Sequence, residues 1–167
     1  MACLGVLFAI DDETLKKLKS LNTDEKRLEF LQEEIEEKFF EEFPDYLAEL
    51  DKAWDAIHRS LTDGKLEWEN GTYPLSHVIL GGELLYFQED YIMTLKTPEQ
   101  VIEISNAIHK ISEKEFRDGY DKIDKKDYGF ELTEEDFEYT FEWFNNSKDF
   151  WKKAADQRRA VIFTADQ

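Results

Sequence analysis

Three short apolar runs along the chain have the length and composition of strands. Residues 4–10, 91–96 and 159–166 are rich in β-branched, aromatic and other large apolar side chains, and polar or turn-forming residues bound each run. We interpret HVILGG (77–82) as a strand as well, while LSHVILGGELLYF also fits a buried helical turn. The pattern predicts a small sheet that includes residues 4–10, 91–96 and 160–165.

Apolar residues at spacings of three and four predict helices between these runs. The predicted helices span residues 12–21, 24–43, 45–61, 98–112 and a long segment that begins after Thr133. Thr97 and Gln100 form a capping box around Pro98 and mark one of these starts. Residues 118–132 are expected to form a polar loop, and Asn145-Asn146-Ser147 is a weak point in the last helix.

The predicted helix 45–61 carries the most distinctive side chains. Its apolar face would contain Leu47, Leu50, Trp54, Ile57, His58 and Leu61, whereas Lys52, Asp55 and Arg59 would point away from it. We interpret Trp54 as a core residue, and His58 as a residue at the core's edge whose ring bonds to a backbone carbonyl or a carboxylate. In the alternative interpretation, Trp54 and His58 present a ring and an imidazole to a ligand.

The composition indicates a folded and strongly acidic protein. The 167 residues include 39 acidic and 21 basic side chains, which give a formal net charge of −18. With 13 Phe, 7 Tyr and 4 Trp, the chain has enough apolar area to fold despite this charge. We expect one α+β domain of mixed α/β character over residues 1–167, with about five helices packed on a small sheet that includes both terminal strands.

The distribution of the charge bears on the kind of partner. Residues 24–51 carry 12 acidic and 3 basic side chains, and this net charge of −9 is half of the protein's excess. Such a chain is unsuited to nucleic acids and anionic membranes, and a basic protein is its natural partner. The candidate partner surface consists of Glu33, Glu34, Glu36, Glu37, Glu41 and Glu42. The plain alternative is that the charge serves only solubility.

The sequence contains no signature of catalysis, metal binding or cofactor binding. It has no Gly-rich phosphate loop, no HExxH and no GxSxG motif, and its three histidines match no metal spacing. We therefore assign no catalytic residue, no metal and no cofactor. The one cysteine, Cys3, excludes an internal disulfide, and the lack of a signal peptide or a long apolar span predicts a cytoplasmic location.

Two motifs and a closing segment are specific enough to suggest relatives. The motifs are Lys52-x-Trp54-Asp55-x-x-His58-x-x-Leu61-Thr62-x-Gly64 and the run from Pro74-Leu75-Ser76 through Gly81. Together with the closing FWKKAA…AVIF segment they resemble the YfbM-like family of bacterial proteins, a domain of unknown function, over almost the whole chain. The resemblance implies one compact α/β-type domain in a bacterial cytoplasm and supplies no catalytic residues. The acidic helix 24–43 is less typical of the family.

Two functional hypotheses remain open on the sequence. The first is a non-enzymatic acidic binding protein, such as the immunity partner of a basic toxin. The second is a small-molecule-binding protein or an enzyme, because the two motifs lie only about ten residues apart and could converge on one pocket. The candidate pocket residues are Trp54, His58, Ser76, Gly81 and Gly82. A tight turn or a close backbone approach also explains the glycine pair. The oligomeric state is not predicted.

Overall fold

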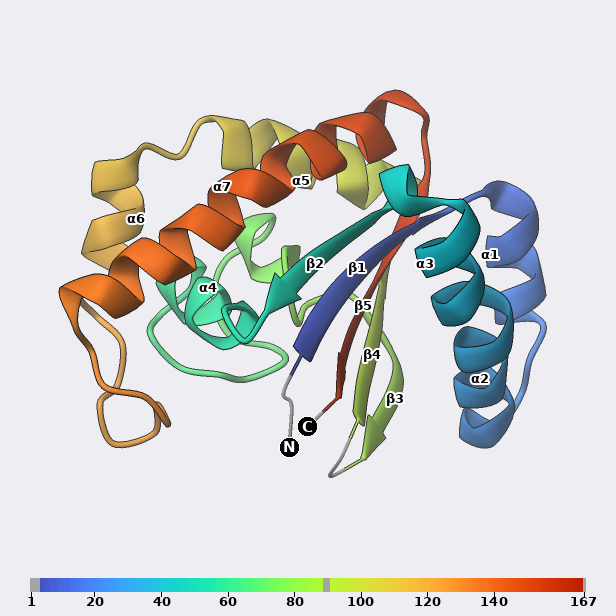
Figure 1. The fold of residues 1–167 in the computed structure, drawn as a ribbon, viewed down its shortest axis with the longest axis horizontal. Coiled ribbons are helices and arrows are strands. Elements are labelled where there is room, and N and C mark those ends of the chain that lie inside the picture. Colours follow the sequence, from blue (N-terminus) through green and yellow to red (C-terminus); the bar gives the residue numbers. More distant parts are fainter. Residues whose placement is uncertain (1–3, 89–90, 167) are drawn as a thin grey trace.

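A five-stranded antiparallel sheet forms the centre of the computed structural model, which describes residues 4–88 and 91–166 (Figure 1). Its strands are β1 (Leu4–Ile10), β2 (Leu47–Asp51), β3 (Glu83–Gln88), β4 (Tyr91–Lys96) and β5 (Ala160–Asp166). They lie in the order β2-β1-β5-β4-β3, so the last strand in sequence order is the middle strand of the sheet. β1, β4 and β5 confirm three of the predicted strands.

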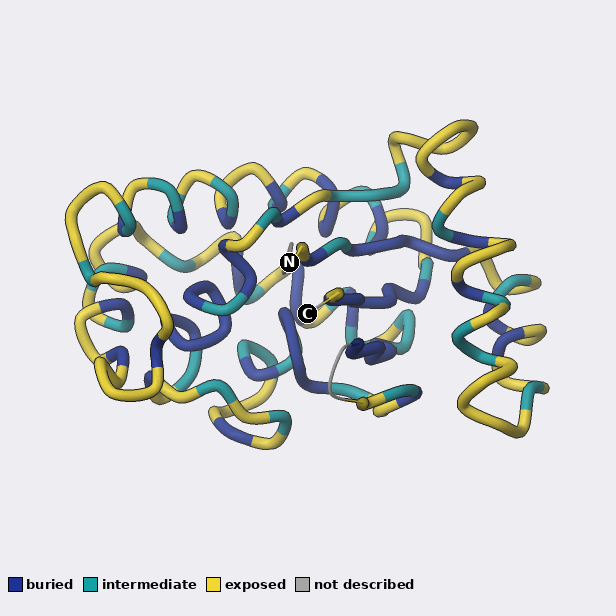
Figure 2. Tube along the Cα trace, turned by 60° about the horizontal axis from the view of Figure 1, so that its bottom comes forward, coloured by how far each residue is buried: buried dark blue, intermediate teal, exposed yellow. Residues whose placement is uncertain are grey.

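The sheet is buried on both faces, which explains its unbroken apolar runs. In β1, Phe8 and Ile10 belong to the core on one face, and Leu7 and Ala9 to the core on the other. Helices α1 (Asp12–Lys19), α2 (Asp24–Phe30) and α3 (Glu37–Glu42) cover the first face. The second face is covered by α4 (Trp54–Leu61), α5 (Pro98–His109) and α7 (Glu134–Asp156). α6 (Glu113–Tyr120) packs against α4 and α7, away from the strands. Figure 2 shows the buried strands between helices whose outer turns are exposed.

α2 and α3 are parts of one continuous helix that a π-helical segment, Leu31–Glu36, joins. The side chain of Thr23 caps its start. Its apolar stripe of Leu31, Ile35 and Phe39 repeats every four residues, which is more than the 3.6 residues of an α-helical turn. The wider π turn therefore keeps this stripe on the sheet. The expected α+β domain, with both terminal strands in one sheet, is confirmed.

Residues 47–51 form an edge strand, so the predicted helix 45–61 is wrong over its first part. The sequence LAELD favours a helix by local propensity, but its backbone pairs with residues 5–8 of β1. This pairing outweighs the small propensity difference. Asp51 has a φ of 48°, in the left-handed region, and ends the strand. α4 then begins at Trp54.

Residues 77–82 are largely buried but do not form the predicted strand. A 3₁₀ turn, Leu75–His77, leads into further turns, in which the Gly81 amide donates to the Ser76 carbonyl. Gly82, with a φ of 121°, ends this run just before β3. The apolar side chains fill the core while the backbone closes turns. The alternative of a buried helical turn is therefore nearer to the structure.

The sequence analysis predicts no helix at residues 113–120, and it suggests a break in the last helix that the structure does not have. α6 occupies residues 113–120, so it includes the start of the segment predicted as the loop 118–132. A capping box formed by Ser112 and Glu115 begins it. α7 runs without a break through Asn145-Asn146-Ser147, where the hydroxyl of Ser147 donates to a carbonyl of its own helix.

Cys3 lies outside the described residues, so the expectation that rests on it stays a prediction. In the two described ranges, no helix has both the length and the apolar character that a membrane crossing requires.

Candidate functional site

Trp54, at the start of α4, is a core residue, as the first interpretation predicts. Its side chain is 3% exposed, and its ring centroid lies 5.6 Å from that of Phe163 in β5. Gly5 in β1 makes room for the indole, because a Cβ at this position would lie 2.8 Å from Cδ1 of Trp54. The tryptophan therefore joins α4 to the middle of the sheet.

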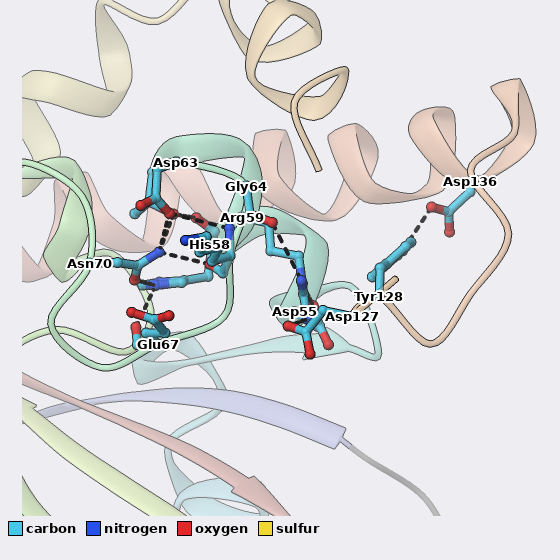
Figure 3. Close-up of polar contacts among 12 residues, drawn as sticks. Asp55, His58, Arg59, Asp63, Gly64, Glu67, Asn70, Asp127, Tyr128 and Asp136 are labelled. Atoms are coloured by element: carbon cyan, nitrogen blue, oxygen red, sulfur yellow. Dashed lines mark hydrogen bonds and ion pairs between the residues drawn. The ribbon is translucent and has the colours of Figure 1, made fainter. Parts of the chain in front are cut away.

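His58 is buried one turn later, and both of its ring nitrogens have partners. Figure 3 shows the bonds of Nε2. Nε2 lies 2.7 Å from Oδ1 of Asn70 and 2.9 Å from the Glu67 carbonyl oxygen, so this nitrogen carries the proton and donates. Nδ1 accepts from the Leu80 amide at 3.5 Å. Burial lowers the pKa of His58, although its bonds to Asn70 and Glu67 oppose this shift. The ring is a neutral structural group inside the core, not at its edge.

Asn70 extends this network through the loop that follows α4. Its Nδ2 donates to Oδ1 of Asp63 at 2.6 Å and to the Lys65 carbonyl at 2.8 Å. The hydrogen bond from Asn70 is also the main reason why the pKa of Asp63 is lowered. His58 and Asn70 together fasten the loop to the core, so their polar groups are used in holding the structure.

Arg59 points into the protein, so the prediction that it faces away from the core is wrong. Its guanidinium pairs with Asp55 and, at 3.0 Å, with Asp127, and it donates to the Gly64 carbonyl (Figure 3). The Tyr128 ring centroid lies 5.5 Å from the guanidinium carbon. Burial raises the pKa of Asp55, and Arg59 opposes that shift. The sequence could not show this burial, because two of the partners come from the distant loop between α6 and α7.

The two sequence motifs meet inside the packed protein. His58 of the first accepts from Leu80 of the second, in the turn that begins at Ser76. His58 and Ser76 are both buried. At Gly82, a Cβ would collide with the Leu95 carbonyl, so a close backbone approach explains this glycine. The two motifs therefore converge as predicted, but their residues pack against one another in the core.

Lys96 is a buried charge-bearing group that the sequence reasoning missed. Although it ends β4, its side chain is fully enclosed, and Nζ donates to the Ile79 carbonyl and the Thr94 hydroxyl. Burial holds the pKa of Lys96 well below its ordinary value. The alternation of Ile92, Thr94 and Lys96 on one side of the strand is the signal that could have placed the lysine inside.

The glutamates of the candidate partner surface lie on the helix that contains α2 and α3. The exposed ones, which we call the acidic face, are Glu33, Glu34, Glu37, Glu41 and Glu42. Glu36 is half-buried. Within the described residues, none of these six carboxylates forms an ion pair. Phe40 and Phe43, 43% and 39% exposed, lie on the same helix, which therefore offers solvent both negative charge and aromatic side chains.

A cavity of 290 Å³, which we call the terminal cavity, lies where β1 and β4 begin and β5 ends. Its acidic lining consists of Glu36, Glu49, Asp51 and Asp166. Its aromatic lining consists of Phe40, Tyr91 and Trp143. The walls come from segments that are far apart in the sequence and show no common motif, so only the fold reveals this site.

Comparison with known proteins places the fold but not an activity. The crystal structure of YfbM from Escherichia coli, a protein of unknown function, is similar over 97% of this chain and 99% of that chain, with a TM-score of 0.63 and 15% sequence identity. None of the curated proteins matches the chain. A family model described as a domain of unknown function, DUF1877, matches residues 1–164. The expected YfbM-like resemblance is thus confirmed, and the chain belongs to the DUF1877 family.

Proposed function

We propose that this protein is a non-enzymatic binding protein whose acidic face captures a basic protein. The observation that carries the proposal is the row of exposed glutamates on one helix, which have no cationic partner among the described residues. Charge of one sign gathered on one surface accelerates encounter with a partner of the opposite sign and disfavours other partners.

Phe40 and Phe43 support the proposal by a second route. Charges at the rim of an interface mainly affect the association rate and its salt dependence, whereas buried aromatic anchors supply much of the affinity. Both phenylalanines are partly exposed beside the glutamates, where a partner would cover them. The surface therefore combines attraction at a distance with apolar contact at close range.

The geometry gives no comparable support to the alternative pocket of His58, Ser76, Gly81 and Gly82. His58 and Ser76 are buried, and the ring nitrogens of His58 are held by Asn70, Glu67 and Leu80. A general base must have a ring nitrogen within reach of a substrate. The polar groups of this region support a structural role instead.

Capture from a cell lysate at low and high salt tests the proposal. The tagged protein is compared with Glu33→Gln/Glu37→Gln/Glu41→Gln, which neutralises three members of the acidic face. The matched control is Glu135→Gln/Glu138→Gln/Glu142→Gln, which removes three charges from α7. We expect a basic protein that the parent and the control retain at low salt, that the first variant loses, and that high salt releases.

Two results would contradict the proposal. One is that no basic protein is captured at low salt, and the other is that both triple variants capture it equally well. The proposal includes the cytoplasmic location that the sequence predicts, so the captured partner should reach the same compartment. Cell fractionation followed by immunodetection checks this part separately.

A further inference from the structure

The terminal cavity lies at the end of the sheet where three strands stop or start. Leu4 of β1 pairs with Asp166 of β5, and Asp166 also pairs with Tyr91 of β4. In Figure 1 the start of β1 and the end of β5 lie side by side at this end of the sheet. The helix that carries the acidic face reaches the cavity with Glu36 and Phe40. The cavity is therefore a concave continuation of the proposed binding surface.

Among the described residues that line this cavity, all of the formal charge is negative. The carboxylates of Glu36, Glu49, Asp51 and Asp166 line it, and its described lining includes no basic side chain. None of the four belongs to an ion pair of the described residues. By contrast, the 330 Å³ cavity between α1 and α3 is lined by three acidic and three basic side chains. In the terminal cavity, therefore, no basic side chain of the described lining balances the acidic ones, whereas basic side chains do so in the 330 Å³ cavity.

Glu36 shows that this negative charge is unfavourable for the fold alone. Burial, and then the nearby charge of Asp166, raise the pKa of Glu36. Burial also raises the pKa of Asp55, but there Arg59 provides a paired cation. Groups that lower stability without a structural role are typical of binding sites. A cation from outside the chain would supply what Glu36 lacks.

The lining favours an organic cation over a metal ion. Among the described residues, no group of three or more His, Cys, Asp and Glu side chains is arranged to hold a metal ion. Phe40, Tyr91 and Trp143 add aromatic surface to the carboxylates. A guanidinium group is planar, so it can pair with a carboxylate through its edge and stack on a ring through its face. An ammonium group lacks this stacking mode of contact.

We propose that the terminal cavity receives an arginine side chain of the basic protein partner. This inference rests on the proposed function, because it assigns one residue of that partner to a place beside the acidic face. The guanidinium would pair with Glu36 and Asp166, and Phe40 would contact its plane. The cavity would then fix the register of the partner, while the exposed glutamates attract it.

A pair of labelled peptides tests the inference by fluorescence anisotropy at low salt. One is a short peptide of arginine, glycine and serine, and the other contains the neutral isostere citrulline in place of arginine. We expect Glu36→Gln/Asp166→Asn to weaken binding of the arginine peptide about tenfold or more, since charged hydrogen bonds are lost. Glu135→Gln/Glu138→Gln, which also removes two charges, should change it less than about twofold. The citrulline peptide should bind neither variant nor parent.

Phe40→Ala provides a second test that leaves the charge unchanged. It should weaken the arginine peptide several-fold, and amide chemical shifts of Thr164 and Tyr91 should move during titration of the parent. Equal binding by Glu36→Gln/Asp166→Asn and its control would overturn the inference. If the acidic-face variant still loses the captured protein in that case, the proposed function stands alone. If neither peptide nor basic protein binds the parent, both proposals fail.

Discussion

Arg59 and Asp55, one turn apart on α4, form an ion pair that is largely buried. Asp127, the second acidic partner of Arg59, is mostly exposed. Removal of one member of a buried pair leaves the other charge without compensation. We expect Arg59→Ala, which leaves Asp55 without its cation, to lower the free energy of unfolding by about 3–5 kcal/mol, measured by urea denaturation. Asp55→Ala should cost less than this, because Arg59 keeps Asp127 as an acidic partner. An Asp55 that faced water, as the sequence suggests, would tolerate its replacement.

Asp127→Ala is the matched control, because Asp127 pairs with the same guanidinium but is exposed to solvent. Its effect should stay below about 1 kcal/mol, as is typical of exposed ion pairs. The double variant Arg59→Ala/Asp55→Ala should lose less than the sum of the single losses, since neither charge is then left alone. Additive losses would show that the two side chains act independently.

Glu36 should make stability depend on pH in the opposite sense to a paired carboxylate. Its pKa is raised in the folded state, so the folded protein binds more protons than the unfolded chain in the window between the two pKa values. Stability therefore falls as pH rises through that window, and the charged Glu36 remains unfavourable at neutral pH. We expect Glu36→Gln to raise the melting temperature at pH 7.

The gain from Glu36→Gln should disappear in acid, where the parent's Glu36 is protonated and neutral. Glu37→Gln, on the exposed side of the same helix, is the control, and it should show little change at either pH. Melting curves at several pH values measure both variants. A Glu36→Gln protein that melts below the parent at pH 7 would mean that this carboxylate stabilises the fold.

At the scale of elements, helices α4 and α6 approach each other very closely. A Cβ at Gly119 would overlap the carbonyl oxygen of Ser60, because the two helix backbones lie against each other. Gly119→Ala must therefore push the helices apart, and we expect it to lower the free energy of unfolding by about 1–3 kcal/mol. Thermal or urea melts measure the loss.

Gly129→Ala is the natural comparison, since a Cβ at this position would have no atom within 4 Å and the φ of Gly129 is not in the left-handed region. Its stability should equal that of the parent or exceed it slightly, because alanine restricts the unfolded chain. Similar losses at both glycines would show that the α4–α6 contact is not responsible.

The elements that could be predicted are those whose own sequence decides their structure. The apolar runs of β1, β4 and β5 and the capping box at Thr97 each carry a complete local signal. β2 could not be predicted, because pairing with β1 overrides the helical preference of its residues. The run at residues 77–82 resembles a strand in sequence, because buried apolar side chains do not reveal whether the backbone pairs or turns.

The candidate site also has one part that the local sequence predicts and another part that depends on distant contacts. The exposed glutamates between residues 33 and 42 could be predicted directly, since a dense run of charge on a helix must face solvent. The terminal cavity could not, because it needs Glu36 turned toward Asp166, a residue at the other end of the chain. The burial of Arg59 is hidden for the same reason, as it depends on Asp127 and Tyr128. Local periodicity contains no information about such contacts.

At the scale of the whole molecule, the two helical layers have different characters. The layer of α4 to α7 contains the polar networks of His58 and Arg59, which are buried and fully engaged. The layer of α1 to α3 rests on an apolar stripe and carries the acidic face on its outer side. The proposed binding surface can therefore vary in sequence with little effect on the networks behind the sheet.

β5 occupies the middle of the sheet although it is the last strand in sequence order, and β1 meets β4 only through it. During synthesis, both outer strand pairs leave the ribosome before β5, so the sheet stays open until residues 160–166 appear. A chain that stops at residue 159 should lack cooperative unfolding and be digested quickly by protease, whereas the chain with β5 resists. Resistance of the shortened chain would contradict this. Closure of the sheet is therefore a late event, which must wait until the other strands and the helices of the described residues have been synthesised.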